Sequence, residues 1–235
     1  MKNVLICKSC NAENPFYEVI CLSCHSFLRE KIFNIDLWKT IEALIETPVI
    51  AYRRIIQSEH KNFTSLIFVV AAFKLFISSI FISIALFKNE NALNLFITRF
   101  LFFLVGILVL VLILSLVLLL VIKSGGIKSR LKDIFAVLTY SLLPYAFAAI
   151  ILFPVELIIF GNYLFSVNPS PFIIKSFIAW VMASLEFLLI LWSIFLLIAG
   201  IYAQTRSLKF SLANSVIFNI IVYSSIYIYS VFLTL

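Results

Sequence analysis

Residues 134–160 read Ile-Phe-Ala-Val-Leu-Thr-Tyr-Ser-Leu-Leu-Pro-Tyr-Ala-Phe-Ala-Ala-Ile-Ile-Leu-Phe-Pro-Val-Glu-Leu-Ile-Ile-Phe, and this stretch decides the fold. It is long enough to cross a bilayer, since about 20 apolar residues suffice. Its two prolines, Pro144 and Pro154, each remove a backbone donor and displace the carbonyl of the residue four positions earlier. Because such groups need partners in hydrocarbon, we expect a kinked helix that lies against other helices.

Two apolar runs precede this stretch and two follow it, so the predicted spans are residues 63–87, 100–122, 134–160, 176–202 and 210–235. The composition agrees, with 63% hydrophobic and 12% charged residues and a mean hydropathy of +1.15. These values lie outside the range of soluble globular domains. The predicted fold class is therefore all-α, a polytopic transmembrane bundle of five spans in a lipid bilayer.

The basic residues predict the orientation of these spans. A net charge of +7 can indicate nucleic-acid binding, but here the lysines and arginines cluster between the apolar runs. Fourteen of them lie in the segments before the first, third and fifth spans, against three in the alternate loops. The positive-inside rule then places the N-terminus in the cytosol and the C-terminus outside, and we expect no nucleic-acid partner.

All four cysteines stand in two pairs near the N-terminus, Cys7-Lys-Ser-Cys10 and Cys21-Leu-Ser-Cys24. Two such turns can complete a tetrahedral four-sulfur site that suits Zn²⁺. A closed site of this kind leaves no position for water, so its role is to fold a small module. Residues 1–33 are thus predicted to be a zinc ribbon.

Two alternatives remain open for these cysteines: two disulfides, or four unrelated thiols. Small zinc ribbons often carry Gly after the second cysteine of each pair, where this chain has Asn11 and His25. Asn tolerates the left-handed conformation, so the departure is mild. His25 could replace a neighbouring thiolate, although we expect it to be a bystander.

Residues 34–62 are predicted to form two amphipathic helices that approach the first span. Apolar side chains recur at helical spacing from Leu37 to Ile45, and Thr47-Pro48 ends the first helix and begins the second. Two interpretations remain open. The helices either lie on an anionic membrane face or pack on the bundle.

Three charges fall inside the predicted spans: Lys74, Glu156 and Glu186. Counted from the cytosolic ends at 1.5 Å per residue, they lie roughly 16, 33 and 24 Å deep, respectively. We therefore expect a buried ion pair between Lys74 and Glu186, with Glu156 near the outer interface. The alternative to this structural pair is a proton or substrate relay.

The sequence holds no pattern typical of catalysis. We find no HExxH, no GxSxG and no complete phosphate loop. Of the two aspartates, Asp36 lies outside the predicted apolar spans and Asp133 lies directly before the third of them. We therefore expect that this protein is not an enzyme.

Several further motifs stand together in this chain: Gly125-Gly126, Tyr140-Ser141-Leu-Leu-Pro144, Glu42 to Pro48, Tyr52 to Ile56, Trp192, Gly200-Ile201 and Ser207 to Ala213. They resemble those of the Yip1-domain family, whose members have five spans, a Gly-Gly loop and a Tyr-Ser-x-x-Pro turn inside the third helix. The resemblance covers about residues 36–235. A weaker alternative is the Arv1-like lipid-homeostasis family, which also opens with two CxxC pairs before its spans.

The Yip1 resemblance implies a trafficking or membrane-shaping role. Eukaryotic members lie in ER and Golgi membranes and bind Rab-type GTPases through their cytosolic N-terminal part. Their Asp-Leu-Tyr-Gly-Pro motif is matched here only at its start, by Asp36-Leu37. A zinc ribbon stands in this region instead, which suits prokaryotic members and implies a prokaryotic plasma membrane.

Two functions follow. The first is a non-enzymatic membrane-organising or trafficking-type scaffold, whose cytosolic zinc ribbon recruits a protein partner. The alternative is a carrier or permease for a lipid or small solute, suggested by the kinked third span and the buried charges. Homo-oligomer formation is left open.

Overall fold

The computed structural model describes residues 3–89 and 93–234. The ends of two predicted segments, residues 1–2 of the ribbon and residue 235 of the fifth span, lie outside the described residues. By its internal contacts the chain forms two compact units. The first contains Met1–Ser65, Val111–Ser141 and Phe195–Val216, and the second contains Leu66–Leu110, Leu142–Ile194 and Ile217–Leu235.

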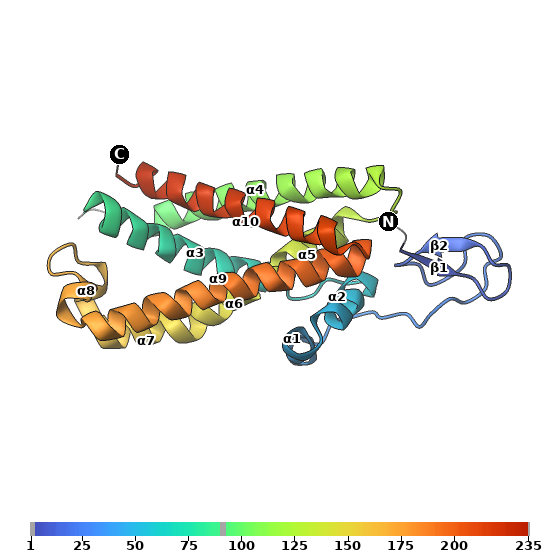
Figure 1. Ribbon diagram of the computed structural model, residues 1–235, viewed down its shortest axis with the longest axis horizontal. Helices are drawn as coiled ribbons and strands as arrows, with labels where there is room; N and C mark the ends of the chain where they lie inside the picture. Colours follow the sequence, from blue (N-terminus) through green and yellow to red (C-terminus); the bar gives the residue numbers. More distant parts are fainter. Residues whose placement is uncertain (1–2, 90–92, 235) are drawn as a thin grey trace. The chain divides into compact units, whose positions relative to one another are not determined.

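The predicted fold class is confirmed: within the described residues, five helices are long and apolar enough to cross a membrane. They are α3 (Thr64–Phe87), α4 (Phe96–Ser124), the composite segment Leu143–Phe165, α9 (Ser176–Thr205) and α10 (Leu208–Phe232). Figure 1 shows α3, α4, α9 and α10 as long helices with no break in the ribbon.

The third span is broken into short segments rather than forming one helix over residues 134–160. Helix α5 (Leu131–Ser141) ends first, and α6 (Leu143–Phe147), a π-helical segment (Ala148–Leu152), α7 (Phe153–Phe160) and a 3-10 turn (Gly161–Phe165) follow it. Pro144 and Pro154 are each the second residue of their helix, α6 and α7. Proline is tolerated at such positions because the missing N–H has no intrahelical partner there in any case.

The N-terminal part of the first unit is a small hairpin followed by two helices. Strands β1 (Val4–Ile6) and β2 (Glu13–Pro15) pair antiparallel, and they form the hairpin drawn in blue in Figure 1. Helices α1 (Leu37–Glu46) and α2 (Pro48–Gln57) then follow.

Helix α1 is capped by Asp36, whose side chain accepts a hydrogen bond from the backbone N–H of Lys39 at 3.1 Å. Helix α2 buries Tyr52 and its apolar neighbours and packs against α5, whereas Trp38 on α1 is 76% exposed. Of the two helices, α2 therefore packs on the bundle through a well-buried face, and α1 keeps a large aromatic side chain on the surface.

At Gly200, helix α9 approaches α5 and α2 closely. A Cβ at this position of α9 would lie 2.6 Å from Cγ1 of Val137 on α5 and 3.1 Å from the ring of Tyr52 on α2. Both neighbours are buried, Tyr52 fully and Val137 to 99%. Only glycine therefore lets α9 approach these two side chains so closely.

We expect Gly200→Ala to destabilise the fold by about 1–3 kcal/mol, because overpacking a dense core forces neighbours off their rotamers. The matched control is Gly106→Ala on α4, where a Cβ meets nothing within 4 Å. That change should be neutral or gain up to about 1 kcal/mol, as alanine is the better helix former. Thermal unfolding of both purified variants in detergent checks this, and equal stability of the two would contradict it.

Candidate functional site

The four cysteines converge in the first unit. Their Sγ atoms all lie within 4.8 Å of one another. Cys7 and Cys24 are 3.5 Å apart and Cys10 and Cys21 are 3.6 Å apart, too far for disulfides, which need about 2.05 Å. A tetrahedral zinc ion with Zn–S bonds near 2.3 Å separates its sulfurs by about 3.8 Å. The cluster fits such an ion in both donor type and spacing.

The two CxxC turns have the same backbone geometry. In each, the N–H of the residue after the second cysteine donates to the carbonyl of the first: Asn11 to Cys7 at 2.9 Å and His25 to Cys21 at 3.0 Å. Asn11 and His25 adopt left-handed φ values of 56° and 57°, the conformation that glycine usually supplies. Within the described residues, the ligand cluster consists of the four thiols and does not include His25.

Two polar side chains that the sequence analysis missed support the cysteines. Ser26 Oγ lies 3.0 Å from Cys7 Sγ and 3.1 Å from Cys24 Sγ. The amide of buried Asn14 donates to Cys21 Sγ at 3.4 Å, and its oxygen accepts from the Leu22 N–H at 2.9 Å. The Ser26 hydrogen bond lowers the pKa of Cys7 to about 5, with help from backbone N–H groups. Such contacts favour the thiolate form that zinc requires.

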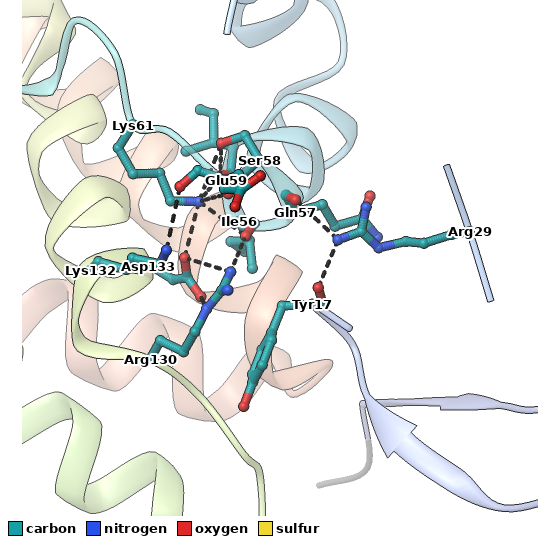
Figure 2. A network of polar contacts seen from close by, with 11 residues as sticks. Tyr17, Arg29, Ile56, Gln57, Ser58, Glu59, Lys61, Arg130, Lys132 and Asp133 are labelled. Atoms are coloured by element: carbon teal, nitrogen blue, oxygen red, sulfur yellow. Dashed lines mark hydrogen bonds and ion pairs between the residues drawn. The ribbon is translucent and has the colours of Figure 1, made fainter. Parts of the chain in front are cut away.

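Arg29 joins residues 3–33, called the cysteine module below, to helix α2. Its guanidinium donates to the Tyr17 carbonyl at 2.7 Å within the module and to the Gln57 carbonyl at 3.0 Å at the end of α2 (Figure 2). Asn3 adds a second link, donating its side-chain amide to the carbonyls of Ala203 at 3.1 Å and Gln204 at 2.6 Å. These contacts therefore fix the module to two other parts of the first unit, the end of α2 and the end of α9.

Arg130, just before α5, makes the third link. Its guanidinium lies 4.2 Å from the ring centroid of Tyr17, a cation–π contact, and donates to the Ile56 carbonyl at 3.1 Å. It also pairs with Asp133 through Nε at 2.7 Å (Figure 2). The module, the end of α2 and the start of α5 thus meet at one arginine.

Asp133 is completely buried and accepts from two cations, because Lys61 Nζ lies 3.0 Å from its carboxylate. Lys61 also donates to the carbonyl of Ile56 near the end of α2 and to that of Ser58, the residue that caps the helix, each at 3.0 Å. Cations stabilise helix C-termini in this way. The sequence analysis counted Lys61 and Arg130 only as orienting charges. Asp133, the lone acidic residue in that basic loop, was the signal for this network.

We expect the ammonium group of Lys61 to lose its proton at a lower pH than an ordinary lysine does. Burial lowers its pKa from 10.5 to about 8, although Asp133 partly counters this effect. Because the folded-state pKa is below the unfolded one, the charged lysine opposes folding below pH 8. That cost fades as pH rises from about 8 to about 10.5.

Carbon-13 NMR of dimethylated lysines checks this pKa, with the Lys61→Arg variant assigning the signal. Asp133→Asn should lower the pKa of Lys61 further, because it removes the favourable charge. A Lys61 signal that titrates at or above pH 10.5 would refute the expectation.

In the second unit, Lys74, Glu156 and Glu186 form a charge triad. Lys74 Nζ is ion-paired with Glu186 and lies 3.5 Å from Glu156 Oε2. The side chain of Lys74 is 1% exposed, that of Glu156 7% and that of Glu186 27%. The structure thus brings the two residues of the predicted pair together and adds Glu156 to them.

The structure does not set Glu156 apart from the other two charges as the depth count predicts, because Glu156 lies 3.5 Å from Lys74 and its side chain is 7% exposed. The depth count began at Ile134 and assumed one continuous helix, but the candidate span begins at Leu143. From there, Glu156 is about 20 Å along the helix at 1.5 Å per residue, a depth comparable to that of Glu186. The break after α5 therefore shortens the depth count for Glu156, which agrees with its contact with Lys74.

The triad lines a cavity of about 620 Å³ within the second unit. Its other walls are mostly apolar and aromatic, and include Phe81, Phe160 and Phe172. Tyr145 and Tyr223 also line it, and their hydroxyls are hydrogen-bonded to each other. The volume is within the range of small-molecule sites, about 300–1,000 Å³.

Comparison with known proteins gives one match. A family model described as the Yip1 domain matches residues 43–234, from within α1 to the end of the described chain. The cysteine module precedes the matched region. Neither the curated proteins nor the solved structures yield a match, and the Arv1-like alternative receives no support.

Proposed function

The chain belongs to the Yip1 domain family, and from that premise we propose that it is a non-enzymatic membrane scaffold that recruits a protein partner through a zinc-loaded cysteine module. With five apolar helices it is a multi-pass integral membrane protein. The observation that carries the proposal is the fixed attachment of the cysteine module to the helices of the same unit.

Asn3, Arg29 and Arg130 contribute to that attachment, together with the ion pair between Lys31 and Glu59 at 2.7 Å. A module on a loose tether loses orientational freedom when it binds, whereas one held in place has already lost it. A closed four-thiol site offers no open coordination position for chemistry. Rigid presentation and a closed metal site suit recruitment better than catalysis.

The proposed organisation is a zinc ribbon over residues 1–33, interfacial helices over 34–62 and a five-span domain over 63–235. The excess of basic residues before the odd-numbered spans supports a cytosolic N-terminus and an outside C-terminus. Reduced thiols also persist on the cytosolic side. The ribbon in place of the eukaryotic N-terminal motif supports a prokaryotic plasma membrane.

The partner surface is proposed around the second CxxC turn. Ile20, Leu22 and Phe27 are 51%, 59% and 67% exposed. Ile20 and Phe27 are opposite each other in an antiparallel bridge, so their side chains lie on the same face. Exposed apolar side chains gathered in this way are typical of protein interaction sites. The expected partner is a cytosolic protein with an apolar surface.

A photo-crosslinking amino acid at Phe27, used in native membranes, tests the proposal. We expect one discrete protein adduct that disappears on metal chelation and in the Ile20→Asp variant. The matched control places the same amino acid at Trp38, which is exposed on α1 outside the module. Lipid adducts alone, or equal adducts at both positions, would contradict recruitment. An adduct to a second copy of this chain would show homo-oligomer formation instead.

The second candidate function is a carrier for a lipid or small solute, and the cavity beside the charge triad favours it. A carrier should show substrate-dependent flux in proteoliposomes that Glu186→Gln abolishes. Flux that persists unchanged in this variant would remove the triad from any transport role.

A further inference from the structure

The charge triad does not balance. One ammonium, on Lys74, faces two carboxylates, on Glu156 and Glu186, which leaves one formal negative charge at the cavity wall. A buried charge without a partner is costly, because the surroundings solvate it far less than water does. A cation that enters the cavity would relieve that cost.

The remaining charged residue of the cavity lining cannot supply this charge. Lys88 also lines the cavity but is exposed beyond the end of α3. It is fourteen residues from Lys74, about 21 Å along a helix at 1.5 Å per residue. By this count Lys88 is too far along the chain to neutralise the triad.

Those walls determine what kind of cation fits. Beside the triad the cavity is bounded by aromatic rings, among them Phe81, Phe160, Phe187, Tyr145 and Tyr223. Aromatic faces attract cations, especially organic ones that are weakly hydrated. A strongly hydrated metal ion would lose its water in such surroundings and gain few oxygen ligands. A cation with an apolar body would gain from both the rings and the carboxylates.

We propose that this cavity binds a hydrophobic organic cation, such as an amphiphilic amine, with its charge against Glu156 and Glu186 and its apolar body against the aromatic walls. The proposal does not depend on the scaffold function. It deepens the carrier candidate by naming a class of ligand. It rests on the same cavity, but it requires only that the ligand binds and not that it is transported.

The test uses two probes of nearly equal size and opposite charge, tetraphenylphosphonium and tetraphenylborate. Equilibrium dialysis of the purified full-length protein in nanodiscs measures the binding of each. We expect saturable binding of one phosphonium per chain and no saturable binding of the borate. Phosphonium binding that does not saturate would show simple partitioning into the lipid, and equal saturable binding of the two ions would show that the site does not select positive charge; either result would overturn the proposal.

Variants then locate the site. Glu156→Gln and Glu186→Gln should each weaken phosphonium binding about tenfold or more, because each removes a desolvated partner charge. Glu42→Gln, which removes an exposed carboxylate on α1, is the control and should bind as the parent does. Unchanged binding in both triad variants would overturn the assignment.

A third variant keeps the proposal testable if the glutamine variants fail to fold. Ala183→Phe adds bulk at the cavity wall without changing any charge and should abolish saturable binding. Retained binding in Ala183→Phe would refute the site. Phosphonium binding without flux in proteoliposomes would support the binding site and exclude the carrier function for this ligand. A failure of the carrier function can therefore be distinguished from a failure of the binding proposal.

Discussion

Removal of the proposed zinc ion is expected to unfold the cysteine module while the membrane helices stay folded. The module contains one two-stranded hairpin, and Cys7 and Cys21 are its most deeply buried apolar side chains. So small a core does not sustain a fold without a metal or disulfides. Structural zinc contributes an apparent binding free energy of about 10–16 kcal/mol in small zinc domains. This is the largest single effect that we expect.

Elemental analysis of the full-length protein should find one zinc per chain. A strong chelator, added in the presence of a phosphine reductant, should make residues 3–33 susceptible to protease and leave the helical circular dichroism of the spans nearly unchanged. Cys10→Ser should do the same. If the reductant alone exposed the module, disulfides and not zinc would hold it together.

Substitutions of two serines near the cysteines test smaller changes in zinc affinity. Ser26→Ala removes the hydroxyl that contacts Cys7 and Cys24 and should weaken zinc affinity by about 10–100-fold, as loss of such supporting contacts typically does. Ser23, between the second pair of cysteines, is exposed. Ser23→Ala should leave the affinity unchanged. A competition titration with a chromogenic chelator measures both, and equal affinities would remove Ser26 from the site.

Lys74→Met is expected to be the most damaging single substitution in the second unit. It leaves Glu156 and Glu186 close together with no cation between them. Breaking a buried ion pair by removing one partner costs about 3–5 kcal/mol. Glu156→Leu and Glu186→Leu should cost less, because each leaves Lys74 with one remaining carboxylate. The order of the three losses therefore distinguishes a triad from a simple pair.

Unfolding in mixed detergent micelles measures these stabilities. The triple variant Lys74→Met, Glu156→Leu, Glu186→Leu should be less destabilised than Lys74→Met alone, since it removes all three charges together. The control is Lys88→Met, at an exposed position just beyond the end of α3, and it should leave the stability nearly unchanged. Losses that simply add across the three sites would mean that the triad residues do not interact.

The five spans could be predicted from sequence because span formation depends on local properties. Length and hydrophobicity set whether a segment can cross a bilayer, whichever helices surround it. Likewise, the convergence of Cys7, Cys10, Cys21 and Cys24 followed from two short spacings within one small module. The loose motifs from Gly125 to Pro144 correctly indicated the family, which the match over residues 43–234 shows.

The sequence did not predict the break between α5 and α6, and the depth count therefore placed Glu156 apart from Lys74, which it contacts. Pro144 predicts a kink in this apolar run. Nothing in the run indicates that α5 ends at Ser141 and that a separate helix begins at Leu143. The contacts of Asp133 with Lys61 and Arg130 were missed for a different reason. The pair with Lys61 joins residues about 70 positions apart, and no local pattern carries such a pairing, whereas Arg130 lies only three residues before Asp133.

By itself, the sequence determined the five-span all-α class, the four-cysteine cluster and the family, because each depends on residue type and short spacing. The tertiary structure alone decided that Glu156 joins Lys74 and Glu186 beside a cavity and that Arg29 and Arg130 hold the cysteine module. Those arrangements depend on where helices break and which faces meet, and the free energy of burying charge then selects the partners.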